Sequence, residues 1–111
     1  MEGGTVPSSS KPAAVADGDS LGRLEAWYHA QCDGEWEHEY GVTVETLDNP
    51  GWKLRIDLAG TELAGREFAR REDHRSENDW LVCWVEGRQF QAACGPRNLR
   101  ESLQTFLSWA R

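Results

Sequence analysis

The sequence predicts an α+β domain in which an antiparallel sheet of four to five strands is flanked by an N-terminal and a C-terminal helix. Three observations predict this class. The middle of the chain contains short segments with alternating apolar residues, separated by turns. A segment with helical spacing precedes these strands, and a second one follows them. Strands joined by turns, with a helix at each end of the run, are typical of an α+β sandwich.

The chain has 111 residues, enough for one domain and a tail. Residues 1–18 consist largely of Gly, Ser, Pro and Ala, so ordering them would cost entropy that no packing returns. We expect a disordered tail here, part of which can also come from a start codon assigned too far upstream. Residues 19–111 are expected to form a single α+β domain.

The first helix is expected to begin at Asp19 or Ser20, since either is a suitable N-cap, and to end near Cys32, where Gly34 stops it. Its apolar residues recur at helical spacing: Leu21, Leu24, Trp27 and Tyr28. We expect all of these except Trp27 to lie on the sheet. Trp27 can serve the core or the surface.

A loop and a hairpin follow the first helix. Residues 33–39 form an acidic loop that includes Trp36 and contains no Lys or Arg. Residues 40–58 are expected to pair as a hairpin, because each half alternates like a strand with one wet face. The alternating apolar positions are Tyr40, Val42 and Val44 in the first half and Trp52, Leu54, Ile56 and Leu58 in the second. Between them Pro50 presets φ for a type II turn, and Gly51 is expected to take the positive φ.

The second half of the chain contains three further segments. Residues 63–68 are expected to form a short strand or an irregular edge, and residues 66–75 a charged, solvated face or loop. Residues 80–85 are apolar on both faces and are the best candidate for a central strand. Glu86-Gly87 indicates a tight hairpin, after which residues 88–93 return as a strand. Gly95-Pro96 is expected to start a last helix, whose stripe is Leu99, Leu103, Phe106, Leu107 and Ala110.

The charge of the chain bears on its partners. A formal net charge of −7 and a pI near 4.9 oppose binding to nucleic acid, and they favour a basic protein as partner. Three Cys cannot all pair within one chain, so a reducing compartment is expected. The sequence has no signal peptide and no apolar segment of membrane-spanning length, so we expect a cytoplasmic protein without membrane contact.

The acidic loop is the sharpest candidate for a binding site. Interface hot spots favour a large aromatic at the centre with charges at the rim, and Trp36 lies among four acids: Asp33, Glu35, Glu37 and Glu39. The loop can equally be a solvated segment with Trp36 capping the core. The Asp48-Asn49-Pro50-Gly51 turn and Trp52 can form a second, rigid contact, or they can be present only because the hairpin and core need them.

The cysteines suggest two further chemistries, a thiol enzyme and a metal site. The spacing from Cys94 to Arg100 is similar to the phosphate loop of cysteine phosphatases and the active loop of sulfurtransferases, where helix N–H groups and an Arg lower the thiol pKa. Against this, Pro96 removes an N–H donor and Leu99 is bulky. His29, Cys32 and His38 lack the paired spacing of a zinc site, so neither a metal nor any other cofactor is expected.

The run from residue 24 to residue 58, LEAWYHAQCDGEWEHEYGVTVETLDNPGWKLRIDL, resembles the immunity protein 53 family of bacterial polymorphic toxin systems. Its members carry a similar WY..QC.G.WEH..G...ETLDNPGW...IDL run. A looser similarity continues through Thr61, Glu67, Phe68, the Asp79-Trp80 pair, Asn98 and Leu99. The resemblance implies a small intracellular inhibitor that binds a cognate toxin, and it implies no catalytic residues.

The function predicted from the sequence is therefore that of an immunity protein, without enzyme activity, that occludes the active surface of a toxin. The toxin is expected to be basic, for example a nuclease. The predicted toxin-binding residues are Asp33, Glu35, Trp36, Glu37, Glu39, Asp48 and Trp52. The alternative is a small cysteine-dependent enzyme that uses Cys94 and Arg100. The sequence leaves the oligomeric state open.

Overall fold

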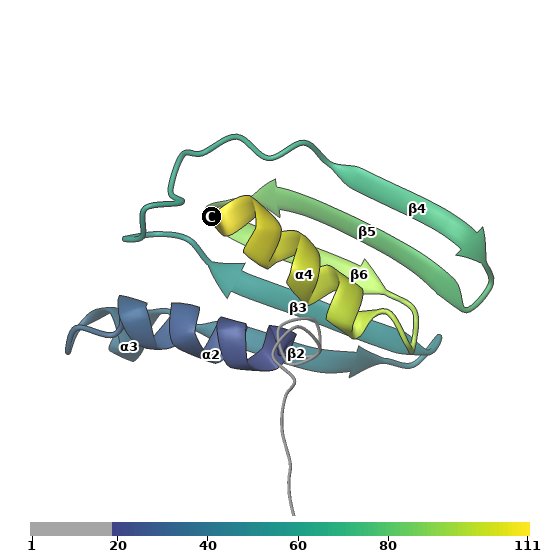
Figure 1. Ribbon diagram of the computed structural model, residues 1–111, viewed down its shortest axis with the longest axis horizontal. Helices are drawn as coiled ribbons and strands as arrows, with labels where there is room; N and C mark the ends of the chain where they lie inside the picture. The colour runs from purple at the N-terminus through teal and green to yellow at the C-terminus, as the bar shows by residue number, and fades with distance from the viewer. Residues whose placement is uncertain (1–18) are drawn as a thin grey trace, which may run out of the picture.

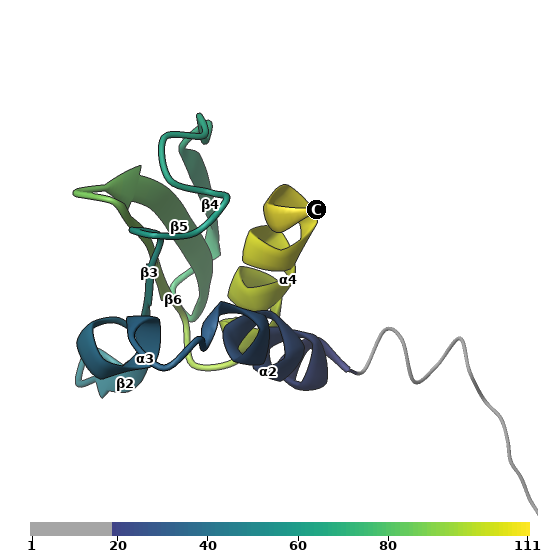
Figure 2. The ribbon, with the colours of Figure 1, turned by 90° about the vertical axis from the view of Figure 1, so that its left-hand side faces the viewer.

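A computed structural model describes residues 19–111, and the tail expected at residues 1–18 lies outside the described residues. The chain forms a five-stranded antiparallel sheet with a helix at each end of the sequence, which confirms the predicted fold class (Figure 1). The elements are α2 (Ser20–Gln31), α3 (Trp36–Glu39), β2 (Val42–Leu47), β3 (Gly51–Asp57), β4 (Arg71–Ser76), β5 (Asp79–Glu86), β6 (Gln89–Cys94) and α4 (Leu99–Ala110). Figure 2 shows α2 and α4 on the same side of the sheet.

The strand order is β2-β3-β6-β5-β4, so β6 is the middle strand. The hairpin β2–β3 and the three-stranded meander β4–β5–β6 are joined through the pairing of β3 with β6. Residues 80–85 therefore lie in an interior strand, as predicted, but one place away from the centre. The predicted tight turn is present, since Gly87 and Arg88 have φ values of 60° and 61° as a two-residue hairpin turn requires.

The core lies between the sheet and the two long helices. Alternate residues of the inner strands face the helices and are buried: Leu54, Ile56, Leu81, Cys83, Phe90 and Ala92. The predicted stripe of α4 covers them with Leu103, Phe106 and Leu107. The rings of Phe90 and Phe106 lie 5.2 Å apart, and that of Trp27 lies 5.0 Å from Phe106. A fully buried Leu, Ile or Phe side chain contributes about 1.5 to 3 kcal/mol, so this layer supplies most of the stability of the fold.

The bounds of α2 match the prediction, but its placement differs. Leu24 is buried, whereas Leu21 is 62% exposed and Tyr28 is 38% exposed. The expectation that Leu21 lies on the sheet is therefore wrong, and Tyr28 covers only the start of β2, beside Val42. The physical reason is that α2 packs against α4 and runs along the edge formed by β2, so the sheet covers only part of its apolar face (Figure 1).

Gly51 does not take the positive φ that a type II turn would need. It is instead the first residue of β3, and a Cβ at this position would overlap the carbonyl oxygen of Cys94 on β6. Glycine is therefore needed here because two backbones approach closely, not because of turn geometry.

Two predictions for the second half need correction. Residues 63–65 form a turn and residues 66–68 are irregular, so this segment matches the irregular alternative and not the short strand. The charged segment is an exposed face, but it is no loop throughout, because its second half lies in the edge strand β4. Its Arg71 and Arg75 reach across to Glu101 of α4, with N–O distances of 2.8 and 2.6 Å. Residues 95–97 form a turn, in which the Asn98 N–H donates to the Gly95 carbonyl, so α4 begins at Leu99 instead of at Pro96.

Candidate functional site: the acidic corner and the groove between α2 and β2

The acidic segment predicted as a loop is folded by two of its own carboxylates. Asp33 accepts hydrogen bonds from the backbone N–H groups of Glu35 and Trp36 at 2.9 and 3.0 Å. Glu37 reaches back and accepts from the N–H groups of Asp33 and Gly34 at 3.0 and 2.9 Å. Backbone N–H donors lower the pKa of both carboxyl groups: those of Trp36 and Glu35 act on Asp33, and for Glu37 its own N–H acts most strongly, with those of Asp33 and Gly34. The reciprocal bonds resemble a capping box and produce the short helix α3.

Trp36 lies in the interior of this corner. Its side chain is 6% exposed, and its indole N–H donates to the Ala59 carbonyl at 2.8 Å. The rings of Tyr28 and Tyr40 both lie 6.0 Å from it. It offers a partner almost no surface, so the prediction that Trp36 anchors a contact does not fit its position. The sequence does not distinguish the two orientations, because a Trp between acids can face inward or outward.

The other two acids, Glu35 and Glu39, do not take part in these backbone hydrogen bonds through their side chains. Glu35 and Glu39 are exposed, and with Asp33, Trp36, Tyr40 and Gly60 they line a shallow hollow of about 210 Å³. We call the surface formed by Asp33, Glu35 and Glu39 the acidic corner. Within residues 19–111, Glu35 and Glu39 make no ion pair, so their charges can attract an oppositely charged partner.

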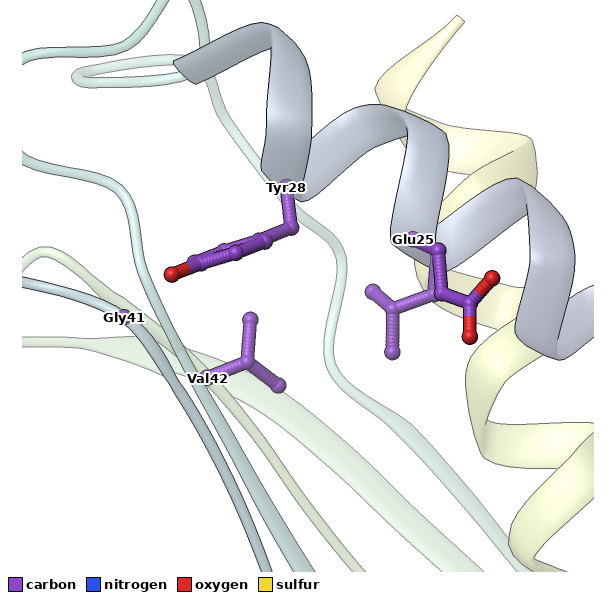
Figure 3. A pocket seen from close by; sticks show the side chains of 5 residues that line it. Glu25, Tyr28, Gly41 and Val42 are labelled. Carbon is purple, nitrogen blue, oxygen red and sulfur yellow. The ribbon is translucent and has the colours of Figure 1, made fainter. Parts of the chain in front are cut away.

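An apolar groove adjoins the acidic corner. It has a volume of about 310 Å³ and is lined by Leu24, Glu25 and Tyr28 of α2 and by Gly41 and Val42 at the start of β2. In Figure 3, Tyr28 and Glu25 project from the helix, and Val42 projects from the strand toward it. We call this feature the α2–β2 groove. Sequence reasoning missed it, because it depends on where α2 lies relative to the sheet.

The same two elements carry the most exposed apolar side chains. Within residues 19–111, three large hydrophobic side chains are exposed: Leu21, Tyr28 and Val44. All three lie on α2 or β2. Val44 is 43% exposed although it lies on the helix side of the sheet, in register with Leu54. The helical spacing of Leu21 and Tyr28 in the sequence indicated an apolar face on this helix, but it did not indicate that part of this face stays exposed. Partly exposed apolar side chains beside a hollow often indicate a binding surface.

The negative charge of the protein is concentrated in this part of the chain. Residues 19–48 contain eight Asp and Glu but one Lys or Arg, Arg23. The rest of the chain contains the other eleven acids and the other eleven basic residues, so its formal charges cancel. The whole net charge of −7 therefore arises from the segment that forms α2, α3 and β2.

The seven residues predicted to bind a partner do not form one cluster. Asp48 is exposed in the turn after β2, and the Trp52 indole N–H donates to the Pro96 carbonyl at 3.0 Å near the start of α4. Both lie at the far end of the β2–β3 hairpin from the acidic corner. A six-residue strand separates the two ends, which corresponds to about 20 Å.

The structure does not support the alternative of a thiol enzyme that uses Cys94 and Arg100. Cys83 and Cys94 are buried, and burial raises the pKa of Cys83 to about 12 and also raises the pKa of Cys94. A nucleophilic thiol needs the opposite shift. Arg100 is exposed on α4. Among residues 19–111, no three His, Cys, Asp or Glu side chains converge in a way that could hold a metal ion.

Comparison with known proteins places the chain in a family. A family model described as immunity protein 53 matches residues 21–111, nearly all of the described chain. No curated protein and no solved structure matches the sequence. Within residues 19–111, no helix combines the length and the apolar character needed to cross a membrane.

Proposed function

The chain belongs to the immunity protein 53 family, and from this membership we propose that it neutralises a cognate bacterial toxin by binding it through α2, α3 and β2. The protein acts in this proposal as an inhibitor in the cytoplasm, and it performs no chemistry of its own. We choose this surface because of the charge distribution: the whole net charge of −7 belongs to the segment that forms α2, α3 and β2.

The partner that fits this surface is a basic toxin. A concentrated negative field raises the rate at which a positively charged protein arrives, and it orients that protein before contact. Nucleases are one class that fits, since their substrate requires a basic surface. The inhibitor then covers the basic surface that the substrate would occupy.

The contact is arranged as an apolar centre with a charged rim. The α2–β2 groove supplies the apolar part with Leu24, Tyr28 and Val42. Glu35 and Glu39 of the acidic corner supply charges at one end. Apolar centres with polar rims are the usual anatomy of protein interfaces, and the apolar part determines how slowly the complex dissociates. Asp48 and Trp52 lie away from this centre, so they contribute at most to its periphery.

The experiment compares single charge reversals in and away from the acidic corner. Glu35→Lys and Glu39→Lys change exposed acids that α3 does not need for its fold, and Glu77→Lys is a matched change in the β4–β5 turn. The probe is the product of an adjacent reading frame, accepted as the cognate toxin once it is shown to kill cells that lack this chain. We expect each single variant, Glu35→Lys and Glu39→Lys, to associate more slowly than the original chain at low salt and with a flatter salt dependence. Combining the two should slow association about tenfold.

The control should associate with the toxin at the same rate as the original chain. Equal on-rates for all variants at every salt concentration would show that the acidic corner does not steer the toxin. Failure of the unmodified chain to bind this toxin or to protect cells from it would contradict the proposed function itself.

A further inference from the structure

The strand β2 forms one edge of the sheet. It pairs with β3 on one side, and no other strand within residues 19–111 pairs with its outer side. All four of its inner residues, Thr43 to Thr46, are exposed. An unpaired edge presents a row of N–H and C=O groups that can pair with a strand from another chain.

The register of the β2–β3 hairpin identifies the outward groups. The Asp57 N–H donates to the Gly41 carbonyl at 3.0 Å, which makes this the first hydrogen-bonded pair of the ladder. Bonded and non-bonded pairs alternate in an antiparallel ladder, so Thr43 and Glu45 also bond to β3. The N–H and C=O groups of Val42, Val44 and Thr46 therefore point away from the sheet. They form three donor and acceptor positions along a free edge.

The two edges of the sheet differ in how they are protected. The other edge, β4, contains a register shift between His74 and Ser76, and its arginines pair with Asp73, Asp79 and Glu101. Bulges and charged side chains are the usual devices that prevent edge pairing. The strand β2 has neither a Pro nor a Lys, its register is regular, and four of its six residues are Val or Thr. It is therefore the edge that can accept another strand.

Charge decides between the possible occupants of this edge. A second copy of the chain would bring two segments of formal charge −7 side by side, with Glu45 near the centre of both strands. Like charges facing each other across a strand pair are destabilising. A basic strand from a different protein gains attraction from the same charges. The edge is thus unfavourable for self-association and favourable for a basic partner.

We propose that the toxin inserts an extended basic segment that pairs with β2 and extends the sheet as a sixth strand. This inference rests on the proposed function and specifies the form of the contact. Alternate side chains of the added strand face α2, where the partly exposed Tyr28 lines the α2–β2 groove with Val42. The segment that fits therefore alternates apolar residues, which pack under α2, with Lys or Arg. Main-chain bonds supply affinity in this mode, and the alternate side chains supply specificity.

Amide hydrogen exchange on the unmodified protein tests the proposal directly. The probe is again the product of the adjacent reading frame, once it is accepted as the cognate toxin. We expect the outward amides of Val44 and Thr46 to exchange rapidly in the free protein and at least tenfold more slowly in the complex. The amides of Thr43 and Glu45, which bond to β3, should be protected in both states. A complex in which Val44 and Thr46 continue to exchange rapidly would overturn the proposal and leave the proposed function intact.

A pair of variants at one position provides the second test. Val44→Pro removes an outward N–H that makes no bond within the sheet, and proline is tolerated on an edge strand at such a position. Val44→Thr keeps the N–H and nearly the same shape. We expect Val44→Pro to bind the toxin about tenfold more weakly, with an unchanged circular dichroism spectrum, and Val44→Thr to bind within about threefold of the original. Equal binding by both variants would overturn the proposal.

Sedimentation of the free protein distinguishes the competing occupant. The proposal expects a monomer in which Val44 and Thr46 exchange rapidly. A dimer that protects these same amides would assign the edge to a second copy and overturn the proposal. Absence of any binding between the unmodified chain and the toxin would instead refute the proposed function on which the inference rests.

Discussion

The indole N–H of Trp36 donates to the carbonyl oxygen of Ala59 at 2.8 Å, and this bond joins the short helix α3 to the segment that follows β3. The two residues are 23 positions apart, and the bond is formed inside a corner where Trp36 is 6% exposed. It fixes the acidic corner to the sheet, so the position of Glu35 and Glu39 depends on it.

Replacement of Trp36 should therefore lower stability. Trp36→Phe keeps most of the packing and loses the bond, for an expected cost of about 1 kcal/mol, or about 4 to 8 °C in Tm. Trp36→Ala should cost about 3 to 5 kcal/mol, since it also leaves a cavity. Thermal unfolding of the two variants measures both effects. A Trp36→Ala variant with unchanged Tm would show that this ring is not part of the core.

Gly51 and Gly41 form a matched pair for backbone crowding. Gly51→Ala places a methyl group against the carbonyl oxygen of Cys94, whereas a Cβ at Gly41 meets nothing within 4 Å. Neither glycine has a positive φ, so the comparison isolates contact from backbone strain. We expect Gly51→Ala to lower the free energy of unfolding by about 1 to 3 kcal/mol and Gly41→Ala to change it by less than about 0.5 kcal/mol. Denaturant titration measures both, and equal stabilities would refute the close approach of β3 and β6.

Acid should destabilise the fold in a defined pH range. Backbone donors lower the pKa of Asp33 and Glu37, the Arg75 guanidinium lowers the pKa of Asp79, and Arg75 together with Asn98 and Arg71 lowers that of Glu101. A carboxyl group with a lowered folded pKa stabilises the fold above its ordinary value, 3.8 for Asp and 4.5 for Glu. That contribution is lost as the pH falls through the lowered value. Tm should therefore decrease as the pH falls below about 4.5.

The Glu101→Gln variant is the control for this titration. It removes one charge that pairs with Arg71 and Arg75, so it should have a lower Tm at neutral pH and a smaller further loss in acid. Tm measured from about pH 6 to about pH 2 tests both points. Parallel curves for the two proteins would show that Glu101 carries no pH-dependent stability.

The three thiols should differ in reactivity. Burial holds the pKa of Cys83 at about 12 and raises that of Cys94, so both thiols stay protonated at neutral pH. Cys32 is only half-buried. We expect a thiol-specific colour reagent to label Cys32 rapidly in the folded protein and the other two only after unfolding. Cys32→Ser should abolish the fast phase, and rapid labelling that persists in this variant would revive the thiol-enzyme alternative.

Much of the fold could be predicted because local patterns and tertiary packing agree. The bounds of α2, the two hairpins and the stripe of α4 follow from periodicity and turn residues, and the structure has each of them. The strand β4 could not be found in this way. Its sequence, REDHRS, has no apolar alternation, because its side chains form ion pairs with α4 in place of apolar packing.

The candidate site was predicted less completely, for a physical reason that Trp36 illustrates. The clustering of acids is a property of the sequence, whereas the direction of the Trp36 ring depends on a bond to Ala59 that no local pattern indicates. Likewise, turn chemistry favoured a positive φ at Gly51, but the constraint there comes from Cys94, 43 positions later. The α2–β2 groove depends on the placement of a whole helix, which periodicity does not determine.

The acidic elements α2, α3 and β2 are contiguous in sequence, and β2 alone connects them to the sheet through backbone pairing with β3. Under the proposed function, recognition would be encoded in residues 19–48, whereas most of the core is encoded in the remainder of the chain. If partner choice resides in these elements, substitutions in this first third can redirect it while β3 to α4 continue to supply most of the core. A graft of residues 19–48 from one relative onto another is accordingly the smallest exchange that would transfer partner choice between them.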